Sequence, residues 1–335
     1  MATDFRSDTI TRPTPGMRAA MASAEVGDDV FGDDPSVNAL QDETAALLGF
    51  EAALFVASGT QGNLIAVMSH CARGDEVIVG QEAHTYRYEA GGGAVLGSVQ
   101  PQAITNRPDG TLAIADIERA IKPNDAHFAR TRLIALENTI GGKVLPEGYV
   151  DEVRALADRH GLAMHLDGAR LWNAAVHRGV GPRDIARSFD SVSVCLSKGL
   201  GAPVGSVLCG KREFIARAHR MRKMLGGGMR QAGILAAAGR YALAHHVERL
   251  AQDHANATRL AQGLAKHPAL AVQPPQTNMV FVEVAVDVAP RFSEHLKRHG
   301  VAVTGVERQR WVTHLDVTER DVDTALAAVD RFFQA

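Results

Sequence analysis

One lysine follows an apolar run of the sequence, where an unpaired charge would be costly to bury. In the stretch SVSVCLSKGLGAPVG (191–205), alternate positions are valine or leucine, as in a buried strand, and Lys198 comes two residues after the last of them. A lysine amine that is shielded from water gives up its proton more readily and can then form a Schiff base. The glycines after Lys198 allow the backbone to approach a flat ligand closely.

A carboxylate and an arginine stand at the end of an earlier apolar run. Asp167 and Arg170 lie in HLDGAR (165–170), and parallel-sheet proteins bind ligands at the carboxyl ends of their strands. Asp167 can equally be a helix cap or a turn residue, and Arg170 can be an ion-paired surface residue. Beside Asp167 at a strand end, however, Arg170 could hold a carboxylate through two parallel hydrogen bonds.

Two further segments fit a flat, anionic ligand. SGTQGN (58–63) lies between a strand pattern and a helix pattern, so Ser58, Gly59 and Thr60 offer hydroxyl and backbone N–H groups at a helix N-terminus, where anions bind. The segment is neither GxGxxG nor a Walker motif, which disfavours a dinucleotide or ATP, and alone it is better explained by a helix cap without a ligand. His84, soon after the strand pattern DEVIVG, could stack on a flat ring.

Together these residues match the needs of one cofactor. Pyridoxal 5′-phosphate requires a lysine for its aldehyde carbon, a carboxylate for its ring nitrogen and donors for its phosphate. Lys198, Asp167 and the 58–60 turn supply these three groups in one chain. The combination is much more specific than its parts, and it predicts a pyridoxal phosphate site.

The elements around these residues indicate an α/β fold with a mainly parallel sheet. Short runs rich in valine, isoleucine and leucine alternate with helix patterns, as in a sheet covered on both faces. Asp34 and Pro35 predict the start of a helix, and Gly49 predicts its end. The expected strands are residues 52–58, 75–80, 132–139, 162–170, 191–198 and 205–210.

A second, smaller domain is expected at the C-terminal end. Residues 211–267 look almost wholly helical, with a break at 226–228, and the pattern changes after Pro274 and Pro275. We therefore expect a large α/β domain over residues 1–245 and a small α+β domain over 246–335, joined by a long helix. The elements expected in the small domain are strands at 278–284, 301–306 and 310–317, a helix at 292–299 and a last helix from Thr318.

Composition argues against several classes of function. A net charge of −2 disfavours nucleic acid or an anionic membrane as the main partner. The start MATDFRSDTITRP does not look like a signal peptide, and no run approaches the ~20 apolar residues of a membrane span. Three distant cysteines without a CxxC motif fit reduced, buried thiols, and no cluster has metal-ligand spacing. We expect a cytoplasmic protein that acts on a small molecule and holds no metal.

Five longer segments extend the pattern: DFRSDTITRPTPGMRAAM, VGDDVFGDDPSVNALQ, HLDGARLWNA, CLSKGLGAPVGS and GGGMRQAGILAAAG. They resemble the low-specificity L-threonine aldolases, which are pyridoxal-phosphate enzymes of the aspartate aminotransferase type (fold type I). The similarity runs from about residue 4 to residue 317. It implies a large domain with a mainly parallel seven-stranded sheet and a small C-terminal α+β domain.

The resemblance also implies how the cofactor is held. Lys198 would carry it as an internal aldimine, Asp167 would pair with the ring nitrogen, and His84 would stack over the ring. Arg230, in GGGMRQ, resembles an arginine that reaches a phosphate across a subunit interface, which implies a homo-oligomer, in this family a homotetramer with active sites at the dimer interface. The full set of implied cofactor-binding residues is Ser58, Gly59, Thr60, His84, Asp167, Arg170, Lys198 and Arg230.

For the substrate, the resemblance implies that Ser7, Arg170 and Arg310 fix the carboxylate of an amino acid so that the breaking bond stands perpendicular to the cofactor's π system. The implied reaction is the reversible retro-aldol cleavage of L-threonine or L-allo-threonine to glycine and acetaldehyde, through an external aldimine and a glycine quinonoid. Other β-hydroxy-α-amino acids are expected to be accepted as well.

The base that removes the hydroxyl proton is left open. His84 and His127 are candidates because imidazole titrates near the working pH, and a water held by the phosphate is a third. Glu137, in LENT, ends a strand on the same edge and could orient a water or the cofactor, or only cap a turn.

Two other classes of function compete with threonine cleavage. A β-eliminating lyase or a serine hydroxymethyltransferase would share the fold, although no folate-binding feature is readable in the sequence. A non-catalytic protein that kept the fold would be expected to lack the lysine or the carboxylate-binding arginines, yet Lys198, Arg170 and Arg310 are all present. We therefore predict an aldolase.

Overall fold

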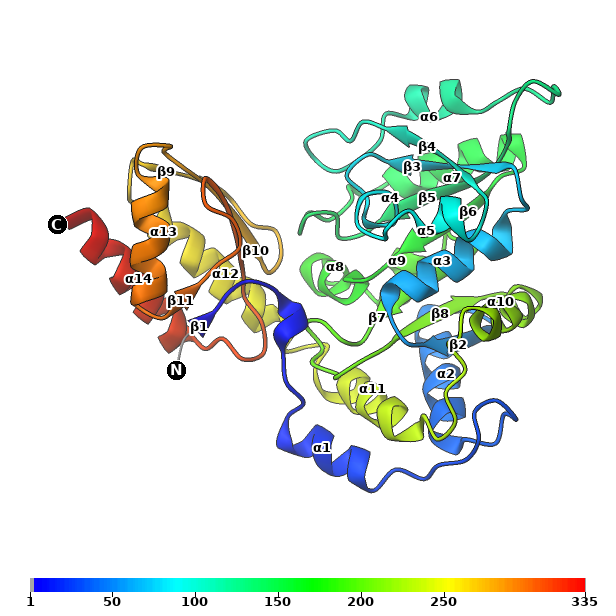
Figure 1. Cartoon of the computed structure of the whole chain (residues 1–335), viewed down its shortest axis with the longest axis horizontal. Helices are drawn as coiled ribbons and strands as arrows, with labels where there is room; N and C mark the ends of the chain where they lie inside the picture. The colour runs from blue at the N-terminus through cyan, green and yellow to red at the C-terminus, as the bar shows by residue number, and fades with distance from the viewer. Residues whose placement is uncertain (1–2, 335) are drawn as a thin grey trace.

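The computed structural model describes residues 3–334, which form two bodies connected through helix α12 (Leu250–Leu264) (Figure 1). The larger body is built on a seven-stranded sheet and the smaller on a three-stranded sheet. Residues 1, 2 and 335, which the predicted domain ranges include, lie outside the described residues. Within residues 3–334, no helix is both long and apolar enough to cross a membrane.

The large sheet is mainly parallel, as predicted. Its order is β2-β8-β7-β6-β5-β3-β4, and only β8 runs antiparallel to its neighbours. The sequence runs indicated six of these strands but missed β4, an exposed edge strand whose sequence QPQAI contains a proline. The strands are β2 (Ala52–Val56), β3 (Asp75–Gly80), β4 (Gln100–Ile104), β5 (Arg130–Glu137), β6 (Ala163–Asp167), β7 (Ser191–Cys195) and β8 (Ser206–Gly210).

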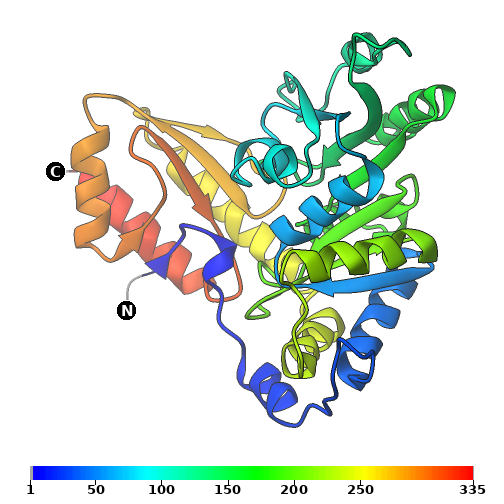
Figure 2. The same ribbon diagram turned by 45° about the vertical axis from the view of Figure 1, so that its right-hand side comes forward.

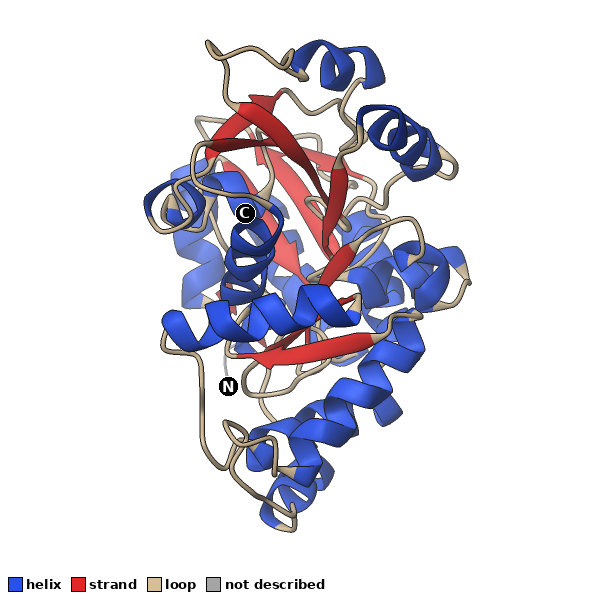
Figure 3. Ribbon diagram, turned by 90° about the vertical axis from the view of Figure 1, so that its right-hand side faces the viewer, coloured by secondary structure: helices blue, strands red, loops and turns tan. Residues whose placement is uncertain are grey.

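Helices cover both faces of this sheet (Figure 3). On the α3 (Gly59–His70) side lie α10 (Arg212–Met224) and the short α5 (Gly92–Val95), and the opposite face carries the larger apolar core. The other helices of the large body are α1 (Pro15–Ala22), α2 (Pro35–Leu48), α4 (His84–Arg87), α6 (Ile114–Ala120), α7 (Tyr149–His160), α8 (Leu171–Arg178), α9 (Pro182–Ala186) and α11 (Gly233–His245).

The two faces of β7 differ in polarity. Val192 and Val194 pack into the larger apolar core. Ser193 and Cys195 point the other way, where they lie against glycines in the first turn of α3, and Ser191 shares their face by the two-residue period. A stripe of small polar side chains therefore runs beneath α3.

The predicted boundaries of α2 are confirmed. Asp34 caps the helix, accepting hydrogen bonds from the backbone N–H groups of Ser36 (3.1 Å) and Val37 (3.0 Å), and Pro35 occupies the first turn. The helix ends at Gly49, whose φ of 78° lies in the left-handed region that glycine adopts without strain.

The smaller body contains the predicted C-terminal strands and helices, with β9 added. Its sheet has the order β12-β10-β9, and a two-stranded parallel pair joins β1 (Thr3–Asp4) to β11 (Val301–Ala302). Phe5 packs in this core against Trp311, so the start of the chain lies in the smaller body (Figure 2). The remaining elements are β9 (Leu270–Gln273), β10 (Met279–Val284), α13 (Ala289–Arg298), β12 (Arg308–Val312) and α14 (Glu319–Gln334).

Candidate active site

The loop after β7 holds Lys198 at the carboxyl edge of the large sheet. The Thr11 hydroxyl, in the segment after the 3₁₀ turn η1 (Asp8–Ile10), donates to the carbonyl of Lys198 (3.0 Å), and the backbone N–H of Gly201 donates to the same oxygen (2.9 Å). The imidazole of His246 bonds the neighbouring Leu200 carbonyl (2.7 Å). The lysine backbone is therefore fixed from two sides, while its side chain is only partly buried.

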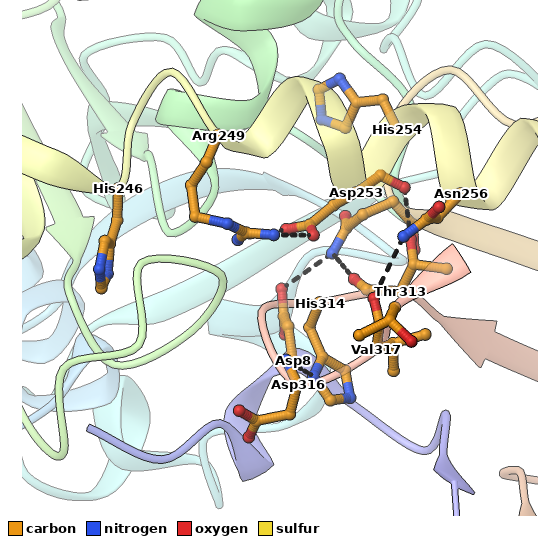
Figure 4. A network of polar contacts seen from close by, with 12 residues as sticks. Asp8, His246, Arg249, Asp253, His254, Asn256, Thr313, His314, Asp316 and Val317 are labelled. Carbon is orange, nitrogen blue, oxygen red and sulfur yellow. Dashed lines mark hydrogen bonds and ion pairs between the residues drawn. The ribbon is translucent and has the colours of Figure 1, made fainter. Parts of the chain in front are cut away.

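Asp8 and Arg170 form a buried pair beside this loop. The Arg170 Nε and Nη2 atoms donate to the two oxygens of Asp8 (2.8 and 2.7 Å), and Asn278 Nδ2 donates to the Asp8 Oδ2 (3.2 Å). Burial alone would raise the pKa of Asp8, but the charges of Arg170 and Lys198 outweigh it and lower the pKa to about 2. Figure 4 shows Asp8 next to the 313–317 segment, with Asp253 of α12 close by.

Asp8 was not among the predicted site residues, although it directly follows Ser7. Ser7 itself caps η1, its hydroxyl accepting hydrogen bonds from the backbone N–H (3.2 Å) and hydroxyl (2.8 Å) of Thr9. The presence of Asp8 means that one edge of the Arg170 guanidinium is already occupied. Arg170 can therefore meet a substrate only through its remaining N–H groups.

We expect Asp8 to make the stability of the fold depend on pH in the acid range. Its folded pKa of about 2 lies below the ordinary 3.8, so the pair with Arg170 stabilises the fold above about pH 5 and is lost as the pH falls toward 2. The free energy of unfolding of the unmodified protein should fall by about 2 kcal/mol more than that of Asp8→Asn over this range. Urea denaturation at several pH values measures this difference, and identical pH profiles would contradict it.

A second arginine faces the same cleft and comes from the smaller body. Arg310, on β12, lines a cleft of about 550 Å³ together with Arg170, His84 and Glu137. Its Nη2 donates to the carbonyl of Arg6 (3.0 Å), but its buried Nε has no hydrogen-bond partner among the described residues. Burial, and then the charge of Arg170, lower the pKa of Arg310. Two cations and a free donor thus favour an anion between them.

Asp167 lies at the end of β6 with His84 and Glu89 nearby. The ligand-type atoms of these three side chains lie within 4.8 Å of one another. Asp167 accepts hydrogen bonds at both oxygens, from the backbone N–H of Ala169 (3.0 Å) and from Asn63 Nδ2 (2.8 Å). His84 Nδ1 bonds Glu89 Oε1 (2.9 Å), and this bond raises the pKa of the His84 imidazole. Burial raises the pKa of Glu89.

Glu137 occupies the neighbouring strand end. It is the backbone partner of Asp167 across β5 and β6, and its Oε2 accepts a hydrogen bond from the His84 backbone N–H (2.7 Å). Burial, and then the charge of Asp167, raise the pKa of Glu137 to about 8. Its carboxyl group is therefore placed to hold a proton near neutral pH in the wall of the cleft.

The SGTQGN turn forms the start of α3, as predicted. The Ser58 hydroxyl caps the helix by accepting a hydrogen bond from the Gln61 backbone N–H (3.1 Å). A Cβ atom at Gly59 would lie 2.8 Å from the Cys195 sulfur, which requires glycine here. Ser58 and Thr60 are exposed, so the helix N-terminus is accessible.

Of the predicted site residues, His84, Arg170 and Arg310 line the cleft. Lys198, Asp167, Ser7 and the 58–60 turn are not among its lining residues, although the charges of Asp167 and Lys198 act on Glu137 in its wall.

Two further predicted residues pair with neighbours elsewhere. His127 lies in the loop after α6, where its imidazole is 87% exposed and bonds Asp125 (2.6 Å). Arg230 lies in the loop before α11, is half exposed and pairs with Asp28 (2.9 Å). Neither residue is among the described residues that line the cleft.

Comparison with known proteins adds the decisive observation. Residues 4–287 match the beta-eliminating lyase family. The chain is 53% identical to the low specificity L-threonine aldolase of Escherichia coli K12, over 95% of this chain and 96% of that protein. The chain belongs to the low-specificity L-threonine aldolase family. It is also 46% identical to the probable low-specificity L-threonine aldolase 2 of Arabidopsis thaliana, over 99% of this chain and 97% of the other.

The fold of the aldolase family is confirmed by a solved structure as well. The threonine aldolase of Leishmania major superposes with a TM-score of 0.84 at 23% identity, covering 98% of each chain. The predicted α/β fold with its seven-stranded, mainly parallel sheet is therefore correct. Enzymes of the aldolase family generally depend on pyridoxal phosphate.

Proposed function

We propose that this chain binds pyridoxal 5′-phosphate and cleaves L-threonine and L-allo-threonine to glycine and acetaldehyde. The observation that carries the proposal is the buried Nε of Arg310, which has no hydrogen-bond partner among residues 3–334 and belongs to a side chain that lines the cleft together with Arg170. A carboxylate is the anion best matched to such guanidinium donors. The curated relatives named above are threonine aldolases, which supports the same assignment.

The residues at the sheet edge fit the cofactor. Lys198 would hold its aldehyde carbon, Asp167 its ring nitrogen, and Ser58, Gly59 and Thr60 its phosphate. Asp167 suits the ring nitrogen because it is a buried carboxylate with acceptor oxygens at a strand end. The 58–60 turn suits the phosphate because it is an accessible helix N-terminus. When bound, pyridoxal phosphate supplies an electron sink for the pair released by breaking Cα–Cβ.

The remaining residues of the cleft orient the substrate and move a proton. Arg170 and Arg310 would hold the substrate carboxylate with Ser7 nearby, and Asp8 would keep the Arg170 fork in place. His84 is the imidazole in the cleft; with its Nδ1 bound to Glu89, its Nε2 would accept the hydroxyl proton. His127 could act only by reaching the cleft of a second chain, because it does not line its own.

We also propose a cytoplasmic homotetramer that accepts other β-hydroxy-α-amino acids. Arg230 would serve the phosphate of a neighbouring subunit; its side chain is half exposed and does not line the cleft of its own chain. Cys71, Cys195 and Cys209 are buried and unpaired, as in proteins of reducing compartments. Size-exclusion chromatography with light scattering tests the assembly.

Product analysis tests the proposed reaction. We expect the chain loaded with pyridoxal phosphate to convert L-threonine and L-allo-threonine into equal amounts of glycine and acetaldehyde, and to form no pyruvate from L-serine. The D-isomers, which place the carboxylate differently relative to the two arginines, should react at least about a hundredfold more slowly. Pyruvate and ammonia from L-serine, with no acetaldehyde from threonine, would instead identify a β-eliminating lyase.

A further inference from the structure

A buried asparagine joins two of the carboxylates of the site, Asp167 and Glu89. Asn63, on α3, is 2% exposed, and its Nδ2 donates to Asp167 Oδ2 (2.8 Å) and to Glu89 Oε1 (2.9 Å). Glu89 in turn bonds the His84 imidazole. The residue proposed to meet the ring nitrogen and the residue proposed to lie over the ring are therefore tied together through a single amide group.

The orientation of this amide is set by a second contact. Asn63 Oδ1 faces His165 Nε2 (3.2 Å), and His165 is fully buried on β6, two residues before Asp167. Both N–H bonds of the amide are used by carboxylates; a flipped amide would place its oxygen against both of them. His165 must therefore carry its hydrogen on Nε2 and donate it to Asn63.

The tautomer of His165 also sets the hydrogen-bond directions at Ser191 and His70. With Nε2 protonated, His165 Nδ1 is an acceptor and takes the hydroxyl hydrogen of Ser191 (2.8 Å). Ser191 Oγ then accepts from His70 Nε2 (2.8 Å) at the end of α3. Burial lowers the pKa of His165 to about 4 and that of His70 to about 3, so both rings are neutral at neutral pH.

We propose that Asn63, His165 and Ser191 are positioning residues that fix the Asp167 and Glu89 carboxylates for the cofactor. Every donor in the chain from His70 to Asn63 points toward these carboxylates, so each bond polarises the next. Removing a link leaves a buried donor or acceptor unpaired and frees the amide to rotate. The assignment rests on the proposed function, since it gives these residues a task only if pyridoxal phosphate binds at Asp167.

Two serines on one strand provide a matched test. Ser191 and Ser193 lie on the same face of β7, and both are buried, but Ser193 Oγ has no hydrogen-bond partner among the described residues. Pyridoxal phosphate is titrated into protein freed of cofactor, with absorbance as the readout. Ser191→Ala should weaken pyridoxal phosphate binding about threefold or more, because it interrupts the series of hydrogen bonds from His70 to Asn63. Ser193→Ala should leave binding unchanged, because Ser193 is not part of that series.

His165 is tested through a disruptive and a conservative variant. His165→Leu should weaken pyridoxal phosphate binding about tenfold or more, the effect typical of outer partners that orient a ligand-holding residue. His165→Gln keeps an N–H group near Nε2 and should recover most of the affinity. KM for L-threonine in the loaded protein should change less than about twofold in both, because the arginines that would bind the substrate are untouched.

The outcomes separate this assignment from the proposed function. Equal pyridoxal phosphate affinities in Ser191→Ala and Ser193→Ala, or no rescue by His165→Gln, would show that these hydrogen-bonded residues only fill space beneath the site. An unmodified protein that binds no pyridoxal phosphate would refute the proposed function itself, and this assignment with it. Both serine variants remove one oxygen without adding volume, so the comparison does not depend on the leucine variant folding.

Discussion

Lys198→Ala is expected to slow the cleavage of L-threonine by at least about a thousandfold, because it removes the lysine proposed to hold the cofactor's aldehyde carbon. Lys198 follows β7 in a loop held by Thr11 and His246. The lysine that lines the cleft itself, Lys143, donates instead to the carbonyl of Pro108 (2.6 Å). After borohydride reduction, the unmodified protein should retain the cofactor covalently and the variant should not, as mass spectrometry would show.

Two comparisons make this result specific. Lys198→Arg keeps a positive charge near Asp8 and Glu137 but cannot bind the aldehyde covalently, so it should be as inactive as the alanine variant. Lys211→Ala removes an exposed lysine at the start of α10 and should retain full activity. Covalent cofactor and undiminished activity in Lys198→Ala would contradict both the cofactor site and the proposed mechanism.

The sequence predicted the scaffold well where the pattern depends on local physics. The strands of the sheet centre are buried and rich in apolar residues, and the Asp34–Pro35 start of α2 is encoded within a few residues. The edge strand β4 was missed because its side chains are partly exposed and do not alternate in polarity. The start of the chain was assigned to the large domain because its pairing with β11 joins residues about 300 positions apart, which no local pattern reveals.

The site residues also divide into those that local sequence predicts and those that only tertiary contacts reveal. Lys198 and Asp167 stand out because each charged group ends an apolar run. Asp8, Asn63 and Glu89 were missed because their roles arise from tertiary contacts: the side-chain hydrogen-bond partners of Asn63 lie 26, 102 and 104 positions away. One signal was nevertheless available, since β6 and β7 place polar residues at alternate positions of otherwise apolar strands. Buried polar groups usually have hydrogen-bond partners, and α3 supplies them to His165, Asp167 and Ser191, whereas Ser193 Oγ has none among the described residues.

Arg310→Ala is expected to raise KM for L-threonine about a hundredfold while changing pyridoxal phosphate affinity less than about twofold. Losing a charged hydrogen-bond pair to a carboxylate in a partly buried cleft costs about 3 kcal/mol, which corresponds to that factor. kcat should fall as well, because a carboxylate held by Arg170 alone can rotate away from the productive orientation. Steady-state kinetics and a cofactor titration measure the two effects separately.

Arg310 is a sharper test of carboxylate binding than Arg170. Replacing Arg170 would leave the fully buried Asp8 without its ion-pair partner, so lost activity could follow from a weakened fold. Within residues 3–334, the Arg310 side chain bonds only the exposed Arg6 carbonyl, so its removal leaves no buried charge without a partner. Arg310→Lys should recover part of the affinity through charge but not the two-point geometry, and the exposed Arg298→Ala should change nothing. An unchanged KM in Arg310→Ala would show that the substrate carboxylate does not bind at the junction of the two bodies. The main support for the proposed reaction would then be lost.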